Sequence, residues 1–172
     1  MAVTRTGAAP ACAKGAIRWV GVSKERKLVA VSRPREVAKD EGWVRLSPVR
    51  VRELEPRIEM SGDGPAAERL LASLAKRLGW DGEELAGPGE PSDVEEHDER
   101  ADFQGAGTFV AAQGVWSIEA SFTADCSGKP VYGSVSTWRN GATASLQCGY
   151  DPSKHGSHEA WVLEAYELAC GS

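Results

Sequence analysis

Apolar and polar residues alternate most regularly in the second half of the chain. Across residues 115–125, polar positions alternate with the apolar set Trp116, Ile118, Ala120, Phe122 and Ala124. A period of two predicts a strand with one buried and one solvent-facing side. Ser127-Gly128 predicts a turn into a second strand at residues 131–138. Asn140-Gly141 predicts a type I′ hairpin leading into a third strand at residues 142–148.

The first sixty residues carry shorter and less regular strand patterns. Residues 16–32 predict two short strands joined by a polar turn at residues 23–26. Residues 43–58 predict a longer strand whose alternation changes phase at Pro48. A period of two cannot survive such a slip, so we expect a bulge or bend there.

Two segments have the pattern of amphipathic helices. Residues 65–78 place four leucines on one face, at Leu70, Leu71, Leu74 and Leu78. Pro65 suits the first helical position and Gly79 suits the residue after the helix end. Residues 157–169 predict a second helix with Trp161, Ala165 and Leu168 on one face.

Charge is distributed unevenly along the chain. Residues 1–60 carry 13 Lys or Arg against 7 acids, whereas residues 81–102 carry 10 acids against one Arg. The acidic segment also contains Gly87-Pro88-Gly89-Glu90-Pro91 and predicts a flexible linker. The simplest account is that it lies near the basic face. No strongly basic domain indicates a nucleic-acid binder.

These elements predict an α+β protein with two small lobes, each made of antiparallel strands followed by one helix and braced by disulfides. The expected divisions are an N-terminal tail (1–14), a basic strand-rich lobe (15–80), the acidic linker (81–102) and a second lobe (103–172) with antiparallel strands and the last helix. A lobe of about 70 residues is marginally stable alone.

Four dispersed cysteines favour two disulfides over a zinc or redox motif, because no C-x-x-C pair occurs. Four buried free thiols are the alternative. In regular hairpins around the two glycine turns, Cys126 and Cys148 would lie too far apart along the sheet to bond. We therefore expect Cys148–Cys170 to tie the last helix to the sheet and Cys12–Cys126 to tie the N-terminus to the second lobe.

No catalytic signature occurs, so we predict no cofactor and favour a protein that is not an enzyme. The one cluster with metal-binding chemistry is Asp151, His155 and His158, whose carboxylate and imidazoles could bind zinc or copper if the loop folded back. The alternative is a polar loop before the helix.

Two groups of side chains are candidates for binding. Tyr132 and Trp138 share one side of a strand with serines and, if exposed, offer aromatic rings to a sugar or a protein partner. Coverage of these rings by other parts of the chain is the alternative. Arg45, Arg50 and Arg52 are candidates for binding an anionic polymer, unless they pair with the acidic segment.

Four short segments resemble small secreted or lipid-anchored proteins of actinobacteria: residues 122–126 (Phe-Thr-Ala-Asp-Cys), 133–138 (Gly-Ser-Val-Ser-Thr-Trp), 146–148 (Leu-Gln-Cys) and 166–170 (Tyr-Glu-Leu-Ala-Cys). The resemblance implies an extracytoplasmic location and no particular activity. Residues 1–14 lack the apolar core of a signal peptide, so an exported protein would have lost its signal. No apolar run approaches the roughly 20 residues that span a bilayer.

The sequence therefore predicts a secreted or envelope-associated binding protein whose partner is a protein or a cell-envelope polymer. The alternative is a small secreted hydrolase or metal-binding protein that uses His155, His158 and Asp151. Oligomeric state is left open.

Overall fold

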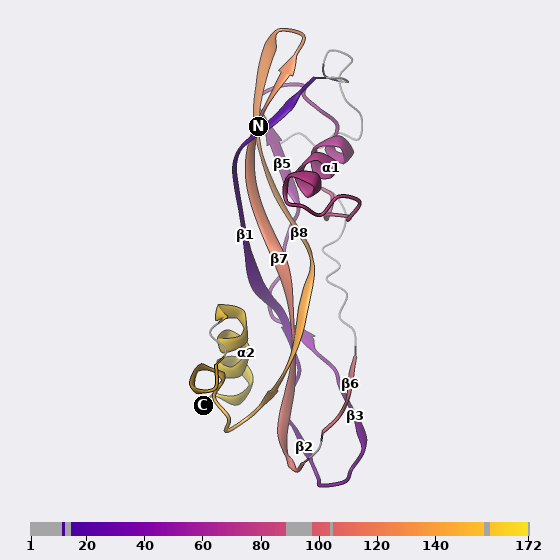
Figure 1. The fold of residues 1–172 in the computed structure, drawn as a ribbon, viewed down its shortest axis with the longest axis vertical. Coiled ribbons are helices and arrows are strands. Elements are labelled where there is room, and N and C mark those ends of the chain that lie inside the picture. Colours follow the sequence, from indigo (N-terminus) through magenta and orange to yellow (C-terminus); the bar gives the residue numbers. More distant parts are fainter. Residues whose placement is uncertain (1–11, 13–14, 89–97, 104, 157–158, 172) are drawn as a thin grey trace. The chain divides into compact units, whose positions relative to one another are not determined.

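The computed structural model describes residues 12, 15–88, 98–103, 105–156 and 159–171. Most of its regular structure is antiparallel β-sheet (Figure 1). One sheet has the order β4-β1-β7-β8-β5, with β2 also paired to β7, and a second sheet pairs β3 with β6. The strands are β1 (Ile17–Val31), β2 (Arg35–Val37), β3 (Trp43–Leu46), β4 (Val49–Arg50), β5 (Arg57–Met60), β6 (Glu99–Asp102), β7 (Gly107–Cys126) and β8 (Lys129–Gln147).

Three long strands each contribute to two compact units. Unit 1 comprises residues 1–25, 54–92 and 117–139, and unit 2 comprises residues 26–53, 93–116 and 140–172. The first part of β1, the second part of β7 and the first part of β8 belong to unit 1, and the remainder of each strand belongs to unit 2. Each unit is therefore assembled from segments that are distant in sequence.

The predicted arrangement of two lobes, each with strands followed by a helix, is wrong. It required chain reversals at residues 23–26 and at Asn140-Gly141, whereas β1 and β8 continue through both positions. In β1 the charged side chains lie on aromatic faces, with Lys24 Nζ 4.9 Å from the Trp80 ring centre and the Arg26 guanidinium 4.6 Å from that of Trp116. These contacts let a polar run remain in a strand.

Gly141 has a different role from the predicted hairpin turn. An added Cβ would lie 3.0 Å from the carbonyl carbon of Val115 and 3.1 Å from the carbonyl oxygen of Gly114. The glycine therefore permits close approach of the β7 and β8 backbones. This explains why an Asn-Gly pair stands inside a continuous strand.

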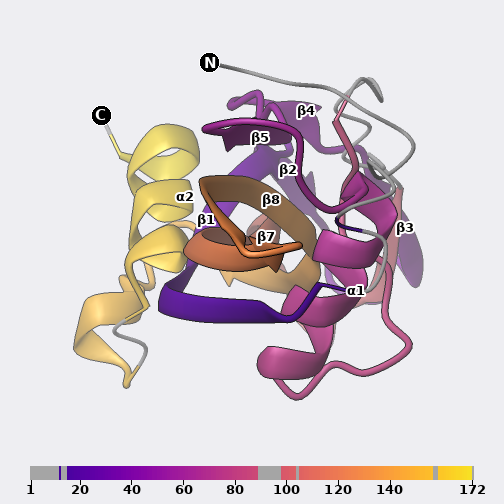
Figure 2. The same cartoon turned by 90° about the horizontal axis from the view of Figure 1, so that it is seen from above.

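The core of unit 1 lies between helix α1 (Ala67–Arg77) and one face of the sheet (Figure 2). Leu70 and Leu74 of the predicted leucine face are fully buried, together with Ile118, Phe122 and Val135 from the strands. Gly79, with φ of 80°, ends the helix region as expected. The helix forms within the predicted range because its stripe of leucines covers the sheet.

The core of unit 2 lies beneath helix α2 (Ala160–Cys170). Trp161, Val162 and Ala165 pack on Leu28 and Val110 of the sheet. A short 3₁₀ helix, η2 (Pro152–Lys154), precedes α2, and Cys148 and Cys170 form a disulfide across the intervening chain. No helix in the described residues is long and apolar enough to cross a membrane.

The last residues of the predicted linker take part in a small sheet. Glu99–Asp102 forms β6 and pairs antiparallel with β3, with Arg45 opposite Arg100 and Trp43 opposite Asp102. The predicted long strand at residues 43–58 is interrupted at Pro48 and divides into β3, β4 and β5. The interruption lies where the phase change predicted it, because proline cannot donate to a strand ladder.

Candidate functional site

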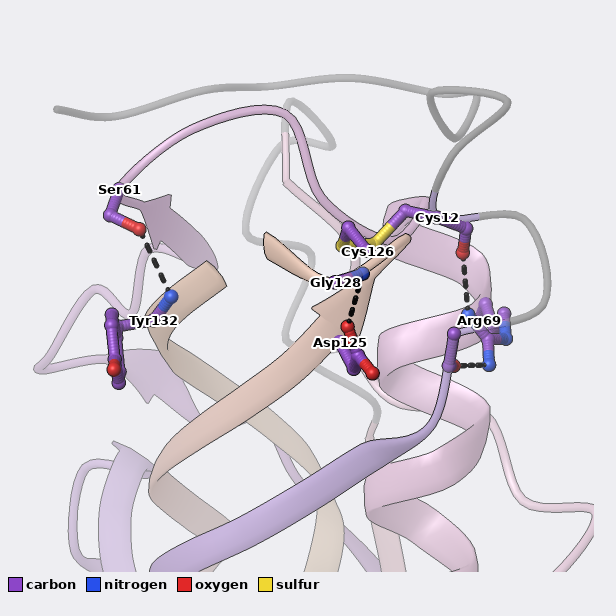
Figure 3. Close-up of a disulfide and its surroundings, with 8 residues drawn as sticks. Cys12, Ser61, Arg69, Asp125, Cys126, Gly128 and Tyr132 are labelled. Atoms are coloured by element: carbon purple, nitrogen blue, oxygen red, sulfur yellow. Dashed lines mark hydrogen bonds between the residues drawn. A yellow bond between two sulfur atoms is a disulfide. The ribbon is translucent and has the colours of Figure 1, made fainter. Parts of the chain in front are cut away.

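The β7–β8 hairpin ends in a tight turn that a disulfide holds (Figure 3). Ser127 and Gly128 have φ of 56° and 82°, as a two-residue type I′ turn requires. The Gly128 N–H donates to Asp125 Oδ1 at 2.9 Å. Cys126, the last residue of β7, bonds to Cys12, and the Cys12 carbonyl accepts from Arg69 of α1 at 2.9 Å. The hairpin end is therefore anchored to the helix.

Both disulfides form in the predicted pairing, Cys12–Cys126 and Cys148–Cys170. The pairing was predicted from a hairpin at Asn140-Gly141, whereas β8 continues through these residues. Two disulfides suggest an oxidising, extracytoplasmic environment.

The two-residue turn also sets which side chains face each other across β7 and β8. Counting outward from it places Glu119 opposite Ser136 and Thr123 opposite Tyr132. The Ser136 hydroxyl donates to Glu119 Oε2 at 2.6 Å, which agrees with this register. On the other side of β8, the Tyr132 N–H donates to the Ser61 hydroxyl at 3.0 Å.

We call the side of the unit 1 sheet that faces away from α1 the outer face. Successive side chains of a strand point to opposite sides of the sheet. Trp19, Phe122 and Val135 point into the core, so the residues next to them in each strand lie on the outer face. Tyr132 and Val20 are its largest exposed apolar groups, at 58% and 61% exposure. Its hydroxyl and charged members include Arg18, Arg57, Glu59, Glu119, Ser121, Thr123, Asp125, Ser134 and Ser136.

A shallow pocket of about 340 Å³ lies at the hairpin end of the outer face. Arg18 of β1 and Thr123 and Asp125 of β7 provide its polar lining, with Pro130 of β8 beside them. Thr123, a lining residue, lies opposite Tyr132 in the hairpin register, so the exposed tyrosine is on the strand next to the pocket. Arg18, Thr123 and Asp125 were not among the predicted site residues, because their proximity depends on strand pairing. Their position on the polar side of each alternating strand was the available signal.

Trp138, the second aromatic residue predicted for this surface, is buried with only 7% exposure. Residue 86 lies alongside β8 here, since the Ala86 N–H donates to the Trp138 carbonyl at 3.0 Å and the Thr137 hydroxyl donates to the Ala86 carbonyl at 2.7 Å. The Trp138 Nε1 has no hydrogen-bond partner within the described residues. The chain therefore covers the Trp138 ring, as the alternative prediction stated, but leaves the Tyr132 ring exposed.

The arginines predicted to bind an anionic polymer have partners within the protein. Arg45 Nε lies 3.5 Å from Asp98 Oδ2. Arg52 forms a two-pronged ion pair with Glu164 of α2 at 2.9 and 3.2 Å and also donates to the Leu28 carbonyl. Arg50 is half-buried in β4. The pairing of Arg45 with Asp98 places one residue of the acidic segment beside the basic strand, and the binding of an anionic polymer by these arginines stays a prediction.

The candidate metal ligands are only partly brought together. Asp151 Oδ1 accepts from the backbone N–H of Ser153 at 2.9 Å and from its hydroxyl at 2.8 Å. These bonds, the hydroxyl first, hold the pKa of Asp151 below its usual range. His155 stacks on Tyr150 with 3.5 Å between ring centres, and His158 lies outside the described residues. Among the residues that the structure describes, no three potential ligands form a metal-binding group.

Comparison of the chain with protein-family models, with curated proteins and with solved structures found no match. The resemblance of the four short segments to secreted actinobacterial proteins therefore stays a prediction.

Proposed function

We propose that the protein is a secreted or envelope-associated binding protein, and that the outer face of unit 1 binds a cell-envelope polysaccharide. One observation carries the proposal: the exposed Tyr132 lies opposite Thr123 in the hairpin register, and Thr123 lines a pocket together with Arg18 and Asp125. A pocket of this size with a few convergent polar groups is typical of a ligand subsite.

The chemistry of the outer face fits a sugar polymer. Tyr132 provides a flat apolar surface against which a sugar ring stacks. Hydroxyls along β7 and β8, including Ser121 and Ser134, add hydrogen-bond donors and acceptors. The face mixes two cationic groups, Arg18 and Arg57, with three carboxylates at Glu59, Glu119 and Asp125, so it carries no excess of positive charge for a polyanion.

The surface is also held in position before any ligand arrives. The Cys12–Cys126 disulfide fixes the hairpin end. Two hydrogen bonds join Tyr132 to Ser61: the Tyr132 N–H donates to the Ser61 hydroxyl, and the Ser61 N–H donates to the Tyr132 carbonyl at 2.8 Å. A preorganised site loses less conformational entropy on binding than a mobile loop. This favours a binding role.

The test is cosedimentation of the purified protein with a panel of insoluble envelope polysaccharides, including peptidoglycan. We expect Tyr132→Ala to weaken binding about tenfold, a loss of roughly 1.4 kcal/mol, because the stacking surface is lost. Tyr150→Ala is the matched control, since Tyr150 is 54% exposed but lies in unit 2. Equal binding by both variants, or no binding of any polysaccharide by the unaltered protein, would refute the proposal.

A further inference from the structure

A second concave surface of unit 1 lies along helix α1. We call it the acidic groove. One wall is the exposed flank of α1, and the other is the chain at residues 83–88. Its volume is about 480 Å³, within the roughly 300–1,000 Å³ range of pockets that bind ligands. It belongs to the α1 side of the sheet, whereas the outer face is the opposite side.

Both walls of the acidic groove are fixed to the core. Helix α1 buries Leu70 and Leu74, and its Ser73 hydroxyl accepts from Trp19 Nε1 at 3.0 Å. The second wall is pinned to β8 by the two hydrogen bonds of Ala86 and by burial of the Leu85 side chain. Because the walls are held by these contacts, the groove is formed in the absence of a ligand.

The lining combines apolar side chains with negative charge. Leu71 of α1 and Pro88 of the second wall supply apolar surface, and Glu68, Glu83 and Glu84 are the charged lining groups. Glu83 lies 3.8 Å from Arg139, and a partly exposed ion pair of this kind contributes little to stability. Among the residues that the structure describes, Glu68 and Glu84 form no ion pair and no Lys or Arg lines the groove.

We propose that the acidic groove binds a cationic, amphipathic peptide segment of a partner protein. The aliphatic side chains of the peptide would contact Leu71 and Pro88, and the Lys or Arg side chains of the peptide would lie beside Glu68 and Glu84. Charge complementarity selects this occupant, since an anionic polymer is repelled and a small inorganic cation leaves the apolar surface uncovered. The site is separate from the outer face, and its test does not depend on polysaccharide binding.

The probe is the capped peptide acetyl-Lys-Leu-Lys-Leu-Lys-amide, titrated into ¹⁵N-labelled protein and followed by NMR. We expect chemical-shift changes concentrated at residues 67–72 and 83–88. The double variant Glu68→Gln/Glu84→Gln should raise the dissociation constant about tenfold, through loss of two charge contacts. Both substitutions are on exposed positions, and unchanged thermal unfolding would show that the fold is retained.

A matched variant separates the groove from general attraction to an acidic protein. Glu36→Gln/Glu53→Gln removes the same charge from exposed positions in unit 2 and should change the dissociation constant by less than about twofold. Equal weakening by both double variants, equal binding of the same peptide with Gln in place of Lys, or no shifts at millimolar peptide would each overturn the proposal.

Discussion

Two glycine-containing pairs, Ser127-Gly128 and Asn140-Gly141, have similar turn signals but different roles in the structure. At the first pair both residues have positive φ, and the chain reverses. At the second, Gly141 stands against the backbone of Val115 inside β8. A glycine permits either positive φ or close approach, and the local sequence does not distinguish them.

This difference predicts the effect of a single methyl group at residue 141. Gly141→Ala should lower the free energy of unfolding by about 1–3 kcal/mol, because the added Cβ meets rigid backbone atoms. Gly21→Ala is the control, since Gly21 also lies in a strand but its Cβ would meet nothing within 4 Å. Urea unfolding of both variants measures the difference. Equal stability of the two variants would contradict the close-approach role.

Short elements of unit 2 depend on local capping. Asp151 immediately precedes η2, in the connection between β8 and α2. Its side chain accepts hydrogen bonds from Ser153 and so caps the start of η2. Asp151 was a candidate metal ligand from the sequence, and in the structure its carboxylate oxygen caps η2. Aspartate followed two residues later by serine is a local turn signal that could have indicated this.

The cap predicts how Asp151 titrates. Its pKa should lie below the ordinary value of 3.8, because the hydrogen bonds from Ser153 favour the charged form. A lowered folded-state pKa means that the cap contributes stability above the unfolded-state pKa and loses it as pH falls through the lowered value. Carboxyl ¹³C NMR titration measures this midpoint. Ser153→Ala should raise it toward 3.8, and a midpoint at or above 3.8 in the unaltered protein would contradict the cap.

At the scale of the whole molecule, the two disulfides close loops of very different length. Cys12 and Cys126 are 114 residues apart, and Cys148 and Cys170 are 22 apart. In the chain-entropy account, the longer loop restricts the unfolded chain more strongly. The first bond also holds the hairpin of the outer face, so it supports both stability and the proposed binding surface.

We therefore expect unequal losses when each bond is removed. Cys12→Ala/Cys126→Ala should lower the free energy of unfolding by about 5 kcal/mol and Cys148→Ala/Cys170→Ala by about 3 kcal/mol. Denaturant unfolding compares them, after intact mass with and without reduction has established both bonds in the unaltered protein. A larger loss for the shorter loop would contradict the entropic account, and four free thiols in oxidised protein would undermine the extracytoplasmic assignment.

Local patterns by themselves determined the two helices, the alternating strand at residues 115–125, the turn at Ser127-Gly128 and the break at Pro48. Each depends on periodicity, capping or backbone restriction within a few residues. Tertiary structure alone decided that β1 and β8 continue past their polar positions, that Trp138 is covered while Tyr132 is exposed, and that Arg18, Thr123 and Asp125 share a pocket. These outcomes depend on contacts between residues far apart in the chain, which no local pattern encodes.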